Sequence, residues 1–223
     1  PRSTPSRRRG RSVAALRAKT RRTRGVLGGR SDRVVQRVLA ATVAELGDSG
    51  YRSFRMDAVS AAAKVNKTTI YRRWPSKAQL VSAAVEWMRR FVHDVALPDT
   101  GTLEQDLFEA FRRKLTFKDR VEGRAWARLL AEQHDPEVAA AISEAVKERS
   151  GEWHGMVRRA VARGELPTGT DSRLLLGMLS AVVDAWNAKA SGRLGAELLL
   201  AAVRTVVSGA RSGSLVRAGR PRG

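Results

Sequence analysis

Residues 54–77, FRMDAVSAAAKVNKTTIYRRWPSK, constrain the fold of this chain more than any other stretch, because their apolar spacing is that of two short helices. The first apolar face recurs at helical spacing and consists of Met56, Val59 and Ala63. Val65 and Asn66 interrupt this pattern, and Ile70 and Trp74 then resume a second apolar face. The stretch therefore predicts a helix, a tight turn and a second helix.

The ends of the second helix carry residues suited to them. The Asn66 side chain can accept a hydrogen bond from a free amide of the first turn, and Pro75 cannot continue a helix. The second helix should therefore be about two turns long. Its outward positions carry hydroxyl, phenol and basic groups, namely Lys67, Thr68, Thr69, Tyr71, Arg72 and Arg73.

This arrangement of side chains suits DNA. A helix-turn-helix places the start of its second helix in the major groove, where hydroxyl and methyl groups reach base edges and basic or phenolic groups bind phosphates. No acid lies between Lys64 and Lys77. The stretch predicts a DNA-binding surface, and the alternative is a solvated basic helix on a protein without a nucleic-acid partner.

Residues 50–81 resemble the N-terminal DNA-binding domain of the tetracycline-repressor (TetR) family, and close matching covers about residues 31–85. The resemblance rests on Gly50-Tyr51 after a first helix, the alanine-rich second helix, the run KTTIY at 67–71, and Trp74-Pro75-Ser76-Lys77 opening a fourth helix. Three residues depart from the family pattern: Arg55 replaces a small capping Thr or Ser, Lys64 replaces Gly in the turn, and Asn66 replaces Ser. The predicted DNA-contacting residues are Arg55, Lys67, Thr68, Thr69, Tyr71, Arg72 and Lys77.

The charge of the chain is concentrated in its first third. Residues 1–77 contain 20 Lys and Arg against 4 Asp and Glu, whereas residues 78–208 contain 18 of each and residues 209–223 contain 4 basic residues and no acid. A basic head on a neutral body indicates one surface for nucleic acid and a second region with another task. We expect a basic, disordered arm at 1–30, a helix-turn-helix domain at 31–77, a helical ligand-binding and dimerisation domain at 78–210, and a basic tail at 211–223.

The arm is expected to lie along phosphates or in a minor groove, with a merely solvated tail as the alternative. In the head, Ser31 or Asp32 is expected to cap a first helix that runs to about Gly47. Ser76 and Gln79 form a capping box for the long helix that joins head to body. Lys77, in the first turn of that helix, is expected to address a phosphate, and a plain surface lysine is the alternative.

The body sequence predicts helices alone, at about 102–117, 121–133, 136–163, 171–190 and 194–210. Gly151 and Gly155 allow for a bend or a break in the third of these. The last two helices carry apolar stripes wider than one core contact requires, which predicts a four-helix dimer interface unless the subunit's own helices fill both faces. The predicted interface residues are Leu175, Leu179, Val182, Trp186, Leu199, Val203 and Val206.

Other chemistry is not indicated. His93, His134 and His154 have no His or Cys partner at metal-ligand spacing, and we expect neither a metal nor a cofactor and no enzymatic activity. The TetR resemblance implies an apolar effector in the body, although most buried aromatic residues are ordinary core. The candidate pocket residues are Trp87, Phe91, Phe108, Phe111, Trp126, His134 and Trp153.

The sequence is thus interpreted as an all-α homodimer with a helix-turn-helix head joined by a long helix to a larger helical body. The expected function is repression at a palindromic double-stranded DNA operator, relieved by a small apolar effector. A non-specific architectural nucleic-acid-binding protein is the alternative, and a helical enzyme would need a catalytic constellation that is not found. Without a span of about eighteen apolar residues or a signal peptide, a soluble cytoplasmic protein is expected, nucleoid-associated when bound to DNA.

Overall fold

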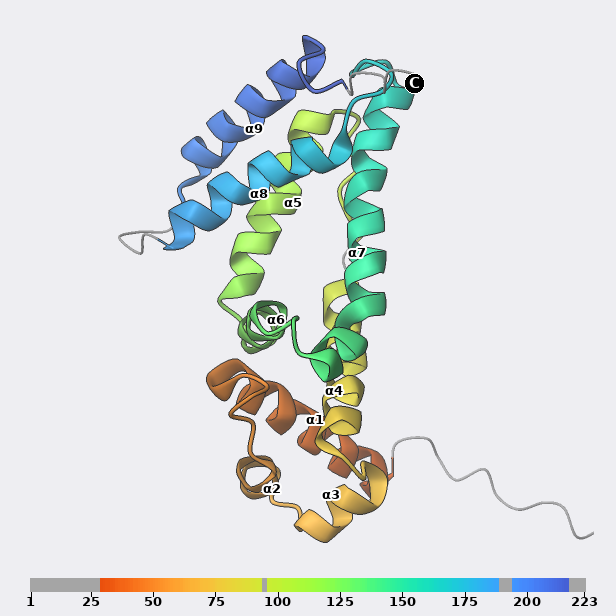
Figure 1. Cartoon of the computed structure of the whole chain (residues 1–223), viewed down its shortest axis with the longest axis vertical. Helices are drawn as coiled ribbons and strands as arrows, with labels where there is room; N and C mark the ends of the chain where they lie inside the picture. Colours follow the sequence, from red (N-terminus) through yellow and green to blue (C-terminus); the bar gives the residue numbers. More distant parts are fainter. Residues whose placement is uncertain (1–28, 94–95, 189–193, 217–223) are drawn as a thin grey trace, which may run out of the picture.

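The computed structural model describes residues 29–93, 96–188 and 194–216, and these ranges form an all-α protein, as predicted (Figure 1). The helices are α1 (Arg30–Ser49), α2 (Met56–Ala63), α3 (Lys67–Arg73), α4 (Lys77–His93), α5 (Leu103–Lys118), α6 (Val121–Ala131), α7 (Pro136–Ala162), α8 (Ser172–Ala188) and α9 (Ala196–Arg211). The predicted arm and most of the predicted tail lie outside the described residues. No helix in the described ranges has the length and hydropathy needed to cross a membrane.

The helices are arranged along one long axis. Helices α1, α2 and α3 gather at one end, α4 leads away from them beside α7, and α8 and α9 pack with α5 at the opposite end (Figure 1). Helix α7 is continuous through Gly151 and Gly155, so the helix does not break there. At about 1.5 Å per residue, the 27 residues of α7 span most of the body.

Two clusters of buried side chains hold the protein together. The first joins α1, α2, α3 and α4 to Ala125 and Leu129 of α6 and to Val138 and Ile142 of α7. The second contains α5, α8, α9 and the C-terminal half of α7. The core of the head therefore includes body residues and does not end at the predicted break after residue 77.

The predicted capping residues are confirmed at the starts of α3 and α4 but not at the start of α1. The Asn66 side chain accepts a hydrogen bond from the Thr68 amide, and Ser76 Oγ accepts one from the Gln79 amide at 3.2 Å, as predicted. The predicted cap of α1 is wrong, because α1 begins at Arg30 and its N-cap is Gly29, without a side-chain bond. Asp32 lies instead in the first turn, where its charge favours the positive end of the helix dipole.

The predicted dimer surface needs correction for five of its seven residues. These five are between 0% and 7% exposed in the single subunit, because they pack in the second cluster, and they are Leu175, Leu179, Leu199, Val203 and Val206. Side chains that are already buried cannot gain burial from a partner. Val182 and Trp186 are 43% and 45% exposed, and they belong to a stripe on α8 that also contains Leu174 and Met178.

Candidate DNA-binding surface

The turn between α2 and α3 spans residues 64–66 and is closed by three local hydrogen bonds. The Lys64 and Val65 amides donate to carbonyls of Ala61 and Ser60, both at 3.1 Å, and Ser60 Oγ donates to the Val65 carbonyl at 2.7 Å. These bonds end α2 and bring the chain directly into the Asn66 cap of α3. The predicted helix, turn and helix are therefore present.

Lys64 adopts the left-handed conformation, with φ 52° and ψ 48°, and is the one described non-glycine residue with positive φ. A side chain with a Cβ makes this conformation unfavourable by about 1–2 kcal/mol. The position at which the TetR pattern has glycine is therefore a position where the backbone favours glycine.

Replacing Lys64 with Gly is expected to stabilise the protein by about 1 kcal/mol, because the strain at this turn is relieved. The change should appear as a higher midpoint in urea unfolding. Lys64→Ala is the matched control, since it removes the same charge but retains a Cβ and the strained backbone. Equal stabilisation by both variants would assign the effect to charge.

Helix α3 presents one exposed face opposite its buried residues. Ile70 is fully buried and Trp74 nearly so, and both anchor α3 in the first core cluster. Thr68, Tyr71 and Arg72 lie three or four residues apart, so they share one side of the helix, and all three are exposed. Tyr71 is 46% exposed, which is unusual for a large aromatic side chain and leaves its ring and hydroxyl available to a partner.

Two more of the predicted contacts are exposed at the N-terminal ends of helices. Lys67 is exposed and forms an ion pair with Asp57 in the first turn of α2, an acid that precedes the acid-free run from Lys64 to Lys77. Because the pair is exposed, it contributes little to stability and Lys67 can exchange Asp57 for a phosphate. Arg55 is exposed at the N-cap of α2, and its amide donates to Glu45 Oε1 at 3.2 Å.

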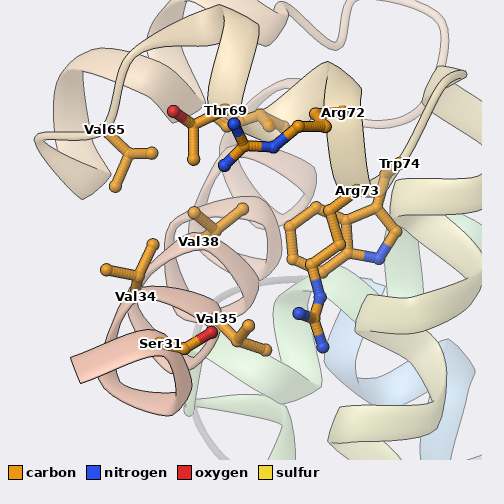
Figure 2. A pocket seen from close by; sticks show the side chains of 10 residues that line it. Ser31, Val34, Val35, Val38, Val65, Thr69, Arg72, Arg73 and Trp74 are labelled. Atoms are coloured by element: carbon orange, nitrogen blue, oxygen red, sulfur yellow. The ribbon is translucent and has the colours of Figure 1, made fainter. Parts of the chain in front are cut away.

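Thr69 differs from its neighbour Thr68, because it faces a hollow of about 270 Å³ between α1 and α3 (Figure 2). Valines line the α1 side of this hollow, namely Val34, Val35 and Val38. Thr69 is only half-exposed there, so it stands apart from the face that contains Thr68 and Tyr71. Arg73, which was not among the predicted contacts, stacks on Trp74 at the edge of the hollow, with its guanidinium carbon 5.5 Å from the ring centroid.

Lys77 lies between the head and the body. Its ammonium donates to the Tyr51 carbonyl at 3.0 Å and lies 3.8 Å from the centroid of the Tyr51 ring. These contacts account for a structural role at the turn between α1 and α2. They leave the phosphate contact of Lys77 as a prediction.

The same turn is tied to the body through two carboxylates. Glu132, at the end of α6, accepts hydrogen bonds from the amides of Tyr51 at 3.2 Å and Arg52 at 2.8 Å. The Tyr51 hydroxyl donates to Glu137 in the first turn of α7. Burial and this hydrogen bond raise the pKa of Tyr51 well above its usual value, so the hydroxyl remains a donor at neutral pH. We name residues 50–52 with Glu132 and Glu137 the head–body junction.

The candidate effector residues do not lie around one cavity. Trp87 and Trp126 pack against the first core cluster, while Phe108, Phe111 and Trp153 pack in or against the second. Phe111 and Trp153 meet edge to face, with ring centroids 4.8 Å apart. His134 is exposed between α6 and α7, and the side chain of Phe91 lies outside the described residues.

Comparison with known proteins agrees with this geometry. The family model "Bacterial regulatory proteins, tetR family" matches residues 38–84, and the model "Tetracyclin repressor-like, C-terminal domain" matches residues 97–206. The HTH-type transcriptional regulator AqdR of Rhodococcus erythropolis is 33% identical over 156 residues, which cover 69% of this chain and 74% of that protein. The DNA-binding transcriptional repressor TetR of Mycobacteroides abscessus is 32% identical over 144 residues, covering 62% of this chain and 73% of that protein.

A solved structure of a TetR-family regulator from Agrobacterium tumefaciens superposes with a TM-score of 0.64 at 18% identity, covering 81% of this chain and 98% of that chain. That similarity extends over both the helix-turn-helix head and the helical body. Together with the match to AqdR and the exposed face of α3, it leads to one conclusion: the chain belongs to the TetR family of helix-turn-helix transcriptional regulators.

Proposed function

We propose that the protein is a homodimeric repressor that binds a palindromic operator through α3 of each subunit and is released when a small molecule binds the body. The observation that carries this proposal is the exposed face formed by Thr68, Tyr71 and Arg72 on a helix anchored from behind by Ile70 and Trp74. A rigid helix with hydroxyl and basic groups on its outer face is suited to a major groove. Such a repressor acts where the chromosome lies, which places it in the cytoplasm.

We assign some residues of this face to contacts with bases and others to contacts with phosphates. Thr68 lies in the first turn of α3, where a short side chain can reach base edges, so we assign it to base reading. Tyr71, Arg72 and Lys67 carry longer donors and are assigned to phosphates. Arg55, at the N-cap of α2, and Lys77, the first residue of α4, are assigned to phosphates too.

A second subunit is proposed to cover the exposed stripe on α8. Leu174, Met178, Val182 and Trp186 recur every four residues and are 42% to 48% exposed, and Leu198 on the neighbouring α9 is 47% exposed. A contiguous apolar strip along two antiparallel helices is characteristic of a protein interface. Packing it against its copy about a two-fold axis buries all of these side chains.

Release by a ligand is proposed to act through the head–body junction. Glu132 holds two amides of the head, and α6 and α7 both pack against the head's core cluster. An effector that binds more tightly to a body conformation with α6 displaced would therefore favour a different position of the head. The shift in this equilibrium is set by the difference in the effector's affinity for the two conformations. Phe108, Phe111 and Trp153 remain the candidate contacts for an apolar effector, because they lie together in the body.

The proposal is tested by selecting bound fragments from random DNA and comparing the selected site with random DNA in titrations. We expect a palindrome whose half-sites are about one helical turn apart, or a multiple of it. Thr68→Ala should change the preferred base at one position per half-site. Equal affinity for selected and random DNA would instead indicate the architectural alternative.

The assignment to phosphates is tested by Arg72→Gln. This variant should weaken binding to selected DNA and to random DNA by similar factors of about ten, and should reduce the salt dependence of binding by about one ion per lost contact. Arg128→Gln on exposed α6 is the matched control, because it removes the same charge away from α3. An equal loss in the control would mean that net charge, and not the α3 face, sets affinity.

A further inference from the structure

The body contains a polar hollow of about 660 Å³ between α7 and the start of α8. The end of α7 and the start of α8 lie at the end of the molecule opposite α3 (Figure 1). Lys147, His154 and Arg158 line the hollow from α7, and Arg173 lines it from the first turn of α8. Its volume lies in the range of small-molecule sites. The DNA-binding surface does not include any of these residues.

The three strong cations of this hollow are without ion pairs in the part of the chain that the structure describes. Lys147 and Arg173 are exposed and make no side-chain contact with an acid, and Arg158 donates only to the Gly151 carbonyl of its own helix, at 3.5 Å. Several other arginines of the body are paired with acids, while Arg113 and Arg124 donate to the backbone carbonyls of Ala96 and Asp119. Examples of the pairs are Arg112 with Glu109, Arg149 with Glu152, Arg163 with Glu165 and Arg204 with Glu104.

The one acid that lines the hollow is already engaged. Asp171 Oδ1 accepts the amides of Arg173 at 2.9 Å and Leu174 at 3.2 Å, so this carboxylate caps α8. His154 Nδ1 and Ser172 Oγ lie 2.8 Å apart and join the two walls. Residues 78–208 of the body have no net charge overall. Within the body, unpaired positive charge is therefore concentrated at this hollow.

The last described residues of the chain meet one edge of the hollow. The Asp171 amide donates to the Leu215 carbonyl at 2.7 Å, and Val216 pairs with Thr170, so the chain reaches the edge of the hollow at Val216. Lys147, Arg158 and Arg173 outnumber the single carboxylate of Asp171 around the hollow, so they repel one another, and a bound anion reduces that repulsion.

We propose that this hollow binds a small anion carrying two or more phosphate or carboxylate groups. Arg158 and Arg173 approach from two different helices, so they can hold two anionic groups of one ligand, and the planar guanidinium suits both chemistries. Gly151 leaves its side of the hollow open, since a Cβ built there meets no atom within 4 Å. The site is separate from the apolar effector region of Phe108, Phe111 and Trp153.

The test is calorimetric titration of the full chain with inorganic pyrophosphate and with citrate. Arg158→Gln combined with Arg173→Gln should weaken binding by about tenfold or more, because two charge-assisted contacts are lost. Arg120→Gln combined with Arg128→Gln removes the same charge from α6 and its N-cap, where both arginines are exposed and neither lines the hollow, and should change affinity by less than about twofold. Tighter binding of pyrophosphate assigns a phosphate ligand and tighter binding of citrate a carboxylate ligand, and either supports the site.

A second pair of variants separates charge from folding. Gly151→Glu places a carboxylate at the hollow, whereas Gly151→Gln places a neutral side chain of the same size there. Both should fold, and Glu should weaken anion binding much more than Gln. Equal losses in these two variants, equal losses in the two double-arginine variants, or no binding of either anion by the unmodified protein would overturn the proposal.

Discussion

Met178→Glu combined with Val182→Glu is expected to give a folded monomer whose operator affinity falls by about a hundredfold or more. Both side chains are exposed in the single subunit, at 42% and 43%, so glutamate is tolerated there before association. In a dimer the same carboxylates would be buried against apolar side chains, at a cost that association cannot offset. Two heads must be held about 34–36 Å apart, or a multiple of that spacing, to meet successive major grooves, so a monomer loses the second half-site.

Sedimentation velocity of the variant beside the unmodified protein measures the oligomeric state, and operator titration measures the affinity. Leu179→Glu is the matched control on the same helix, because Leu179 is fully buried in the second core cluster. It is expected to unfold the protein, since an unpaired charge in the core costs several kcal/mol. If the double variant remains dimeric, the interface lies on another surface, and a folded monomer with full affinity would separate dimerisation from recognition.

Gly50→Ala is expected to destabilise the protein by about 2–4 kcal/mol, from backbone strain and a collision together. Gly50 ends α1 with φ 72° and ψ −178°, a combination that is essentially restricted to glycine. A Cβ at this position would collide with Glu132 Oε1, the oxygen that accepts the Tyr51 amide. The variant should therefore both strain the turn and break the head–body junction.

Urea unfolding measures the loss, and a cycle with Glu132→Ala separates its two parts. In the Glu132→Ala background, Gly50→Ala should cost about 1–2 kcal/mol, because only the backbone strain remains. Gly151→Ala is the control with the same chemistry, and it should stabilise the protein by about 0.5–1 kcal/mol, since Gly151 lies within α7 and its Cβ meets open space. If Gly50→Ala lowers stability as much in the Glu132→Ala background as in the unmodified protein, the head–body junction does not contribute to the loss.

Local signals in the sequence were sufficient to predict the helix-turn-helix. The Asn66 cap, the stop at Pro75 and the Ser76–Gln79 cap act between residues two or three apart, so they operate in nearly the same way in any fold. The helix bounds in the body were predicted closely for the same reason. The α1 start was mispredicted because Ser31 and Asp32 are good caps, yet the helix extends past both to Arg30.

The contacts of the site residues depended on distant parts of the chain. Lys77 was predicted to face a phosphate, and its ammonium is held by Tyr51, 26 residues away. Lys67 appears in an acid-free run, yet Asp57 from the preceding helix reaches it across the turn. Neither partner is visible in the spacing around the lysine, because both contacts are made between elements.

The same limit applies to α8 and to the aromatic residues of the body. Neighbouring residues of α8 are equally apolar, for example Leu174 and Leu175 or Met178 and Leu179. The periodicity of α8 therefore marks a broad apolar stripe and does not show which part of the stripe is buried. Packing against α5, α7 and α9 buries Leu175 and Leu179 and leaves Leu174 and Met178 at the surface. The sequence by itself determined which segments are helices and which helix is suited to DNA, because backbone hydrogen bonds and caps are local. Only the tertiary structure decided which apolar face is core and which is free for a partner, because burial depends on the neighbours that folding brings together.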